Sequence, residues 1–378
     1  VKQKRLCAYS IVFAALTPLW TYFGSDFRLL LAGVFLFVSI CFLDGMLHPK
    51  QVKFEMVSSA LFGALVVPCF LSSFLRLEMN METRLIFGPK EMKNNMNALV
   101  LEGGGMRGLF TAGALDALMD HRIYIDRCYG VSAGACNMIS YYSGQRGRSR
   151  RVNVDYAGDK RYMSWDNFFK TGSLFSEEMM YHTIPETLLP FDYDAYQKAN
   201  PEAYAVATSM LSGRPVYLRV PADLRKDYKP ILASMSLPLI STPVKINGDL
   251  LLDGGLADPI PAEKALKDGC GKLLIVLTRQ KGYVKSPEST LALSKIWYHD
   301  YPSLLRTMER RHTIYNAETA FVEKLEAEGK AVVIRPPHPV EVGRTEKDPR
   351  KLDALYAEGY NETCAAIGKI RELFGIPE

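Results

Sequence analysis

The sequence has no closely spaced pair of cysteines, although it contains seven cysteines among its 378 residues. Neither a CxxC pair nor a zinc-type spacing occurs, so a zinc finger or a dithiol redox motif is excluded. Because the number is odd, we expect reduced and mostly buried thiols rather than a complete disulfide framework. This usage favours a cytoplasmic location for the part of the chain that carries them.

An excess of charge of one sign is also missing from most of the chain. Residues 96–378 hold 36 Lys or Arg against 35 Asp or Glu, whereas residues 1–95 hold ten against six. A nearly neutral remainder argues against a nucleic-acid-binding surface, which needs clustered basic residues. Hydrophobic residues make up 48% of the chain, enough for one large core or two smaller ones.

Charge is absent altogether from three apolar runs near the start of the chain, at residues 6–23, 29–43 and 56–75. A helix that crosses a membrane needs roughly 20 apolar residues, with a lower limit of about 17. We therefore expect residues 1–95 to form a hydrophobic membrane region of two or three helices. The alternative interpretation is a set of buried core helices in a soluble domain.

The orientation of these predicted helices follows from nearby basic residues. Lysine or arginine at positions 2, 4, 5, 50 and 53 favours a cytoplasmic N-terminus and a cytoplasmic second loop. Three spans would place the rest of the chain outside, and two spans plus one surface helix would keep it inside. We expect a membrane-associated protein whose catalytic part is cytoplasmic. Met92 and Met96 precede the first predicted strand, so the alternative is that residues 1–95 are not native to the protein.

From residue 97 onwards the pattern is that of alternating strands and helices. Residues 98–101 and 129–131 are short apolar runs typical of buried strands, and each is followed by apolar residues at helical spacing. Such alternation predicts an α/β fold with a parallel sheet. Further predicted strands and helices lie at residues 203–210, 216–220, 250–252, 273–277, 289–328, 331–334 and 348–374.

The expected domain boundaries follow from this pattern. We expect a catalytic domain over residues 96–285 and a mostly helical extension over residues 286–378. Residues 144–200 are polar and rich in aromatics, and we expect an irregular insertion there that covers the site.

A GxSxG sequence stands between the second predicted strand and its helix, formed by Gly130, Ser132 and Gly134. A serine on a sharp strand-to-helix turn exposes its hydroxyl at the edge of the sheet, and flanking glycines leave room for the turn. The helix N-terminus also favours the negative charge that develops nearby. GxSxG alone is a weak signal, but this placement predicts that Ser132 is a nucleophile.

A glycine-rich turn follows the first predicted strand and opens the next helix: Gly103, Gly104, Gly105, Met106, Arg107, Gly108. Free backbone N–H groups in such a turn are what an oxyanion hole requires. The same residues also spell GxGxxG, the dinucleotide-binding pattern, which calls for an acidic residue after the second strand. Asp126 has the right spacing but comes before that strand, so we favour the oxyanion hole.

Asp253, Gly254 and Gly255 follow the predicted strand at residues 250–252. A carboxylate at a strand end beside two glycines can approach a serine closely, although an Asp-Gly-Gly sequence alone is most often a simple turn.

The GGGxRG turn, the GxSxG sequence and the later DGG, in this order, resemble the signatures of patatin-like phospholipases over roughly residues 97–280. The likeness is strongest to the bacterial branch with a helical C-terminal extension. It implies a three-layer sandwich around a central, mostly parallel sheet. It also implies a dyad of Ser132 and Asp253 without histidine, and an acyl-enzyme intermediate. Asp258 departs from the Asn of plant members, which affects the expected rim of the site.

The resemblance further implies that the N–H groups of Gly104, Gly105 and Met106 hold the oxyanion while Arg107 adds positive charge. The implied substrate is a phospholipid or another acyl ester in a membrane, and no metal or organic cofactor is implied. The sequence gives no indication of the oligomeric state.

Several alternatives remain open. A triad would need a histidine after the acid, for which His299, His312 and His338 are available without a supporting motif. A catalytically idle membrane-bound regulatory protein and an acyltransferase that shares the acyl-enzyme are two further functions. The arginines at positions 146, 148, 150 and 151 form either a phosphate-binding run or a solvated loop, and we expect Cys136 to be a core residue.

Overall fold

The computed structural model describes residues 96–377, so the three apolar runs predicted to cross a membrane lie outside the described residues. Within residues 96–377, none of the helices combines the length and the apolar character that a membrane span requires.

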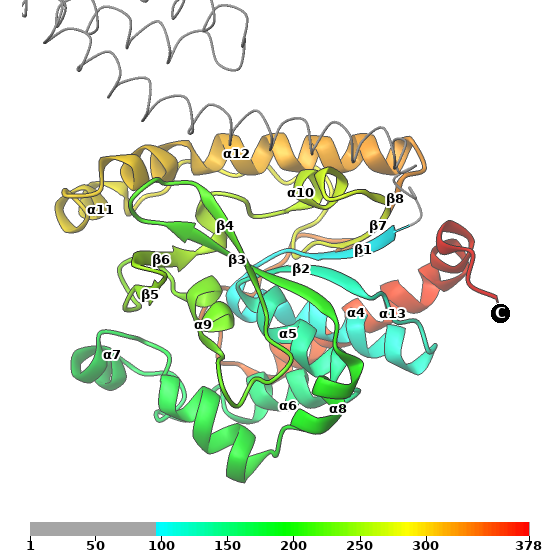
Figure 1. Ribbon diagram of the computed structural model, residues 1–378, viewed down its shortest axis with the longest axis horizontal. Coiled ribbons are helices and arrows are strands. Elements are labelled where there is room, and N and C mark those ends of the chain that lie inside the picture. The colour runs from blue at the N-terminus through cyan, green and yellow to red at the C-terminus, as the bar shows by residue number, and fades with distance from the viewer. Residues whose placement is uncertain (1–95, 378) are drawn as a thin grey trace, which may run out of the picture. The chain divides into compact units, whose positions relative to one another are not determined.

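The centre of the fold is a sheet with the strand order β5-β6-β3-β2-β1-β7-β8, to which β4 adds by pairing with β3 (Figure 1). The strands are β1 Met96–Leu101, β2 Arg127–Val131, β3 Glu202–Ser209, β4 Pro215–Arg219, β5 Val244–Ile246, β6 Asp249–Asp253, β7 Cys270–Val276 and β8 Ala331–Ile334.

The sheet is mixed, because its two halves are connected differently. Strands β8, β7, β1, β2 and β3 pair in parallel, whereas β4 and β6 each pair with β3 in the antiparallel sense and β5 does so with β6. Between β5 and β6, Asn247 and Gly248 take positive φ values of 52° and 86°, the conformation of a tight hairpin turn. The expected parallel arrangement therefore holds only for the half made of strands with helical connections.

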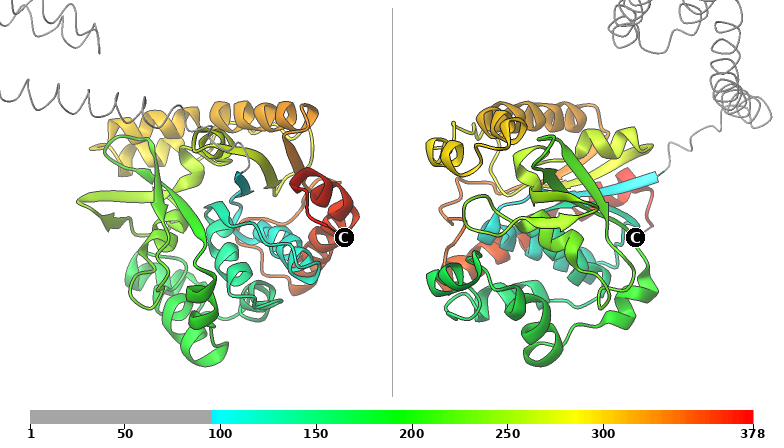
Figure 2. Two further views of the ribbon diagram at one scale, coloured as in Figure 1. Left: turned by 45° about the vertical axis from the view of Figure 1, so that its right-hand side comes forward. Right: turned by 60° about the vertical axis from the view of Figure 1, so that its left-hand side comes forward.

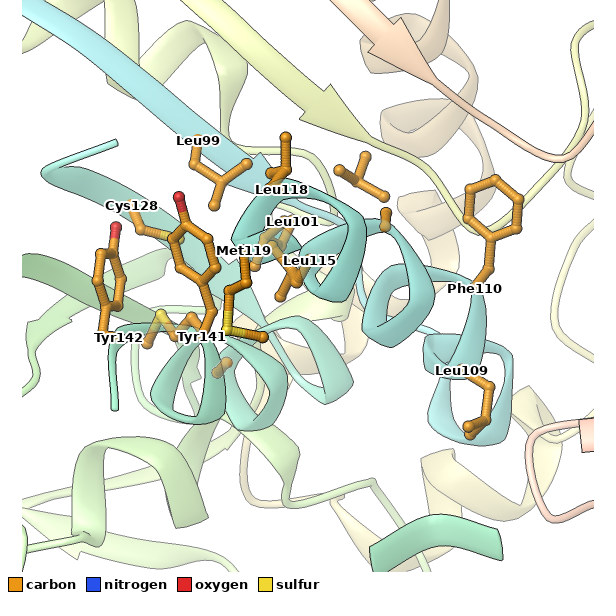
Figure 3. Packing of buried hydrophobic residues seen from close by; sticks show 14 of the residues in the cluster. Leu99, Leu101, Leu109, Phe110, Leu115, Leu118, Met119, Cys128, Tyr141 and Tyr142 are labelled. Atoms are coloured by element: carbon orange, nitrogen blue, oxygen red, sulfur yellow. The ribbon is translucent and has the colours of Figure 1, made fainter. Parts of the chain in front are cut away.

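Helices cover both faces of the sheet and give three layers (Figures 1 and 2). On one face lie α4 (Gly108–Asp120), α5 (Ala133–Tyr142) and α13 (Pro349–Phe374), and on the other lie α10 (Ala262–Lys267) and α12 (Pro302–Ala327). Because helices cover both faces of the sheet, alternate side chains of strand β1 must be apolar on both faces. Its Leu99 and Leu101 pack with α4 and α5 (Figure 3), whereas Ala98 and Val100 belong to the core on the opposite face.

The segment 144–200 is helical, which differs from the expected irregular insertion. It contains α6 (Arg148–Asp155), α7 (Trp165–Thr171), the π-helix η3 (Met179–Leu188) and α8 (Tyr193–Ala199). Tyr162, Met163 and Ile184 are buried together in a small core of its own. Aromatic and apolar residues that are too irregularly spaced to predict a helix pack against one another here and stabilise the short helices.

The remaining elements are short. They are η2 (Gly105–Arg107), α9 (Lys229–Met235), η4 (Gly254–Leu256) and α11 (Leu291–Trp297).

Residues 286–377 pack directly onto the rest of the described chain. Strand β8 extends the sheet beside β7, and α13 crosses α4 at very short range. A Cβ on Gly113 of α4 would lie 2.0 Å from the carbonyl oxygen of Tyr356, and one on Gly359 of α13 would lie 2.0 Å from that of Phe110. Gly113 and Gly359 therefore allow α13 to pack closely against α4, the helix that starts at the glycine-rich turn.

Candidate active site

Ser132 occupies the strained turn that joins β2 to α5. Its φ of 52° and ψ of −119° lie outside the regions that residues with a side chain prefer, which costs about 1–3 kcal/mol. The flanking glycines allow the turn to be tight. A Cβ on Gly130 would lie 2.8 Å from the Cα of Ala135, and one on Gly134 would lie 2.6 Å from the carbonyl oxygen of Leu101. The geometry is that of a nucleophile elbow.

Helix α9 holds this turn in place. The N–H of Ser132 donates to the hydroxyl of Ser234 at 2.9 Å, and that hydroxyl donates to the carbonyl of Val206 at 2.6 Å. Two residues further on, the carbonyl of Ser236 accepts the N–H of Asp253 at 2.7 Å. One end of α9 thus anchors both the serine and the aspartate, and no sequence motif indicates this role.

The register of β3 brings Asp253 level with Ser132. Strand β3 lies between β2 and β6, and it pairs Val206 with Val131 and Ala207 with Asp253. The residue after Val131 is Ser132, so the two side chains lie at the same height on either side of β3. Gly254 allows the backbone after Asp253 to lie close to β3, since a Cβ there would lie 2.1 Å from the carbonyl oxygen of Val206.

The carboxylate of Asp253 is buried and only half satisfied. Its Oδ1 accepts the N–H of Gly255 at 2.7 Å, while Oδ2 has no hydrogen-bond partner in the part of the chain that the structure describes. Burial raises the pKa of this carboxyl, and the nearby Ser132 hydroxyl and the Gly255 N–H partly offset the rise.

The glycine-rich turn lies beside the serine. A Cβ on Gly103 would come within 2.9 Å of the Cβ of Ser132. The Oγ1 of Thr278, after β7, donates to the carbonyl of Gly103 at 3.0 Å and fixes the turn. Gly105 takes a positive φ of 58°.

The free N–H groups in this turn differ from those expected. The N–H of Met106 donates to the carbonyl of Arg344 at 3.1 Å, and those of Arg107 and Gly108 donate to carbonyls within the turn. For Gly103, Gly104 and Gly105 no N–H donation occurs within the described residues. Only these three backbone groups of the predicted set are therefore available to an oxyanion in this conformation.

Two cavities meet at the serine, and both are lined by Gly105, Ser132 and Leu237. The first, called the apolar cavity below, runs beneath α5, α6, η3 and α9 and is lined by residues such as Ile139, Val152, Tyr181, Ile184 and Met235. The second, called the cationic cavity, contains Asp253 and the glycine-rich turn together with Arg107, Arg279, Lys285, Arg311 and Arg344.

The other candidates from the sequence lie elsewhere or take structural roles. No histidine of residues 96–377 lines either cavity, so neither His299, His312 nor His338 completes a triad. Asp126 precedes β2 and therefore lies at the edge of the sheet opposite Ser132, which removes the dinucleotide interpretation.

Asp258 is buried and accepts the hydroxyl of Tyr217, away from the cavity linings. Its departure from the plant pattern therefore does not reshape the rim. Cys136 lines the apolar cavity, where burial raises the pKa of its thiol to about 12 and keeps it protonated.

The basic run after α5 is structural. Arg146 pairs with Asp120, Arg150 with Asp353 and Arg151 with Asp155. Arg148 is buried and donates to backbone carbonyls. All four arginines therefore bind acceptors of the chain itself. This favours the structural interpretation of the run over a phosphate-binding one.

Two known sequence families match parts of the chain. The sequence model of the family described as "Patatin-like phospholipase" matches residues 99–266, and that of a domain of unknown function (DUF6363) matches residues 301–375.

Curated relatives cover different shares of the chain. The uncharacterized protein YjjU of Escherichia coli strain K12 is 27% identical over 260 residues, which span 64% of this chain and 69% of that protein. Lysophospholipase NTE1 of Cryptococcus neoformans is 26% identical over 182 residues, 47% of this chain but 11% of that protein. The uncharacterized NTE family protein Rv1063c of Mycobacterium tuberculosis is 27% identical, with 43% of this chain and 44% of that protein covered.

Among solved structures, that of VipD from Legionella pneumophila aligns with 72% of this chain and 67% of that chain. The TM-score is 0.36 at 13% identity, which adds nothing to the assignment.

The motifs and the family match lead to one conclusion: residues 99–266 form a domain of the patatin-like phospholipase family, a family of lipid hydrolases.

Proposed function

We propose that the protein hydrolyses acyl esters of lipids through a dyad of Ser132 and Asp253. The observation that carries the proposal is the unpartnered Oδ2 of Asp253, which is buried beside a serine held in a strained turn. A buried acceptor without a donor is costly unless it has a task, and accepting the proton of Ser132 is such a task.

The reaction proceeds in two halves. In the first, Ser132 Oγ forms a bond to the ester carbonyl carbon while its proton passes to Asp253. The carbonyl oxygen becomes an oxyanion, which the N–H groups of Gly103, Gly104 and Gly105 stabilise. The C–O bond to the alcohol then breaks, the alcohol leaves with the proton from Asp253, and an acyl-serine remains.

In the second half, water attacks the acyl-serine and gives a proton to Asp253. The acyl C–O bond to Ser132 breaks, the serine recovers its proton, and the fatty acid leaves. The buried position of Asp253 favours both halves, because a carboxylate whose pKa is raised is a stronger base than one in water.

The apolar cavity supports a long acyl chain as the part of the substrate on one side of the ester. It begins at Ser132 and is lined mainly by aliphatic and aromatic side chains, which favours burial of methylene groups by about 0.8 kcal/mol each. The curated relative named lysophospholipase supports the same choice of substrate.

The test is the substitution Ser132→Ala, assayed on a panel of lysophospholipids and short-chain esters. We expect kcat/KM to fall by about 10⁴-fold or more on every substrate, since the nucleophile is lost. Ser143→Ala is the matched control, because Ser143 ends the same helix and lines neither cavity. Survival of activity in Ser132→Ala would remove the serine mechanism.

Two further measurements separate the alternatives. A fluorophosphonate probe should label the wild type at Ser132, and absence of the adduct would favour an idle regulatory protein. Addition of an alcohol acceptor shows whether acyl transfer outruns hydrolysis, which would make the protein an acyltransferase.

A further inference from the structure

The cationic cavity carries more positive than negative charge at the place where the leaving alcohol departs. Five basic side chains line it, together with the three carboxylates Glu102, Asp253 and Glu288. It opens onto Ser132, so a group bound in it lies on the side of the ester opposite the acyl chain.

Four of the five basic residues lie outside the match to the patatin-like family, which ends at residue 266. Arg279 and Lys285 follow β7, whereas Arg311 of α12 and Arg344 lie within the domain of unknown function. Because β8 and α13 pack onto the sheet and onto α4, these segments are fixed against the glycine-rich turn. The backbone of Arg344 itself contacts that turn through Met106.

One carboxylate serves three of these cations. Glu288 accepts Arg311 at 2.5 Å, and Lys285 and Arg344 lie 3.4 Å and 3.7 Å from the same oxygen. Arg279 makes its hydrogen bond to the neutral carbonyl of Val340. The positive charge of the cavity is therefore only partly compensated.

The cost of this arrangement shows in the ionisation of Lys285. Burial and the neighbouring Arg311 and Arg344 lower the pKa of Lys285 to about 8, although Glu288 opposes the shift. Like charges held together without enough counter-charge are unfavourable unless an anion binds between them. The side chains of Lys285 and Arg311 are 13% and 11% exposed, so water relieves little of the repulsion.

We propose that this cavity binds the phosphodiester head group of the lipid whose acyl chain enters the apolar cavity, with Arg344 and Lys285 as its specificity-determining residues. The inference rests on the proposed ester hydrolysis and adds the chemical class of the alcohol part of the substrate. It gives the domain at residues 301–375 a role, which is to complete the substrate site of the patatin-like domain.

The test compares two substrates that differ only in the head group, lysophosphatidylglycerol and monoacylglycerol with the same short acyl chain, each below its micelle concentration. We expect the wild type to prefer the phosphodiester. Arg344→Gln and Lys285→Gln should each lower the ratio of the two kcat/KM values by about tenfold, the loss of one charged contact. Arg311 is less suitable for the test because its Nε also donates to the carbonyl of Gly255.

The matched control is Arg306→Gln, which removes the same charge from an exposed position on the same helix as Arg311. It should leave the ratio unchanged. A ratio that stays at the wild-type value in both Arg344→Gln and Lys285→Gln would overturn the inference while leaving ester hydrolysis intact.

Two further arms complete the test. Inorganic phosphate should inhibit competitively, but inhibition without any preference for the phosphodiester substrate would mean that the cavity holds free phosphate, against the inference. Calorimetric binding of glycerophosphoglycerol to the Ser132→Ala protein gives an answer independent of catalysis. Binding there that weakens in the Arg344→Gln background supports the head-group site even if the serine mechanism fails, and no binding contradicts it.

Discussion

The apolar and cationic cavities share Ser132 but differ in what builds them. Side chains that line the apolar cavity come from residues 105–237, inside the match to the patatin-like family, whereas four cations of the cationic cavity come from beyond its end. The side chains of the apolar cavity exclude water, whereas the charged side chains of the cationic cavity need counter-charges. Under the proposed function, the patatin-like domain supplies the chemistry and the surface that binds the acyl chain, while residues beyond its end supply most of the positive charge.

The ionisation of the two linings reflects this contrast. In the apolar cavity, burial raises the pKa of Cys136 to about 12 and that of Tyr181 well above its ordinary value, so both stay neutral. In the cationic cavity, burial of Glu288 acts in the same direction, but Arg311, Arg344 and Lys285 outweigh it and lower the pKa of Glu288. Burial thus keeps the thiol and the phenol of the apolar cavity neutral, whereas cationic neighbours keep Glu288 of the cationic cavity ionised.

The largest expected effect comes from a change in the cationic cavity, at the aspartate beside Ser132. Asp253→Asn removes the base, so kcat/KM should fall by about 10³-fold or more on charged and neutral lipids alike. Because burial raises the pKa of Asp253, its ionised form destabilises the fold near neutral pH, and the substitution should raise the thermal unfolding midpoint. Kinetics and calorimetry on the same preparation check both. A variant that retains activity would show that another group is the base.

An intermediate effect should follow from filling the apolar cavity. Val152 of α6 is half-buried and lines this cavity, so Val152→Trp occupies part of the space for the acyl chain. We expect kcat/KM for long-chain esters to fall by about tenfold relative to short-chain esters, with the head-group preference unchanged. The exposed substitution Leu211→Trp, outside both cavities, controls for the added indole. An equal loss on all chain lengths would contradict the assignment.

The smallest expected effect is on pH dependence and belongs to the cationic cavity. Lys285 faces Glu288, Arg311, Arg344 and the ring of Tyr315, and its pKa is lowered to about 8. Its charge is present below that pH and is lost as the pH rises through it. The preference for the phosphodiester should therefore decline a few-fold above about pH 8, and Lys285→Gln should abolish that decline. A profile that is identical in both proteins would exclude Lys285 from head-group binding.

The motifs and the order of strands and helices followed from local patterns. Strands β1, β2, β3, β7 and β8 were predicted because their apolar runs are continuous and lie between turn residues. The helical stretch expected at residues 289–328 contains α11 and α12, and Pro302 is the first residue of α12. Each of these signals depends on residues a few positions apart, which is the range over which sequence periodicity carries information.

Long-range features were harder to predict. The helices of the segment 144–200 form because residues distant in the sequence bury one another. The antiparallel pairing of β6 with β3 likewise joins strands that are far apart in the sequence. The occupied N–H of Met106 depends on Arg344, far along the chain, and no motif signals that contact.

The sequence by itself determined that a serine on an elbow, a glycine-rich turn and an aspartate before two glycines occur in the order of one family. Tertiary structure alone decided which groups meet. The register of β3 places Asp253 beside Ser132, and hydrogen bonds to the end of α9 hold both residues in position. The same holds for the four cations from residues 279–344 that converge beside the serine. Convergence of this kind depends on how helices and strands pack, since a charge carries no periodic signal that would reveal its partner.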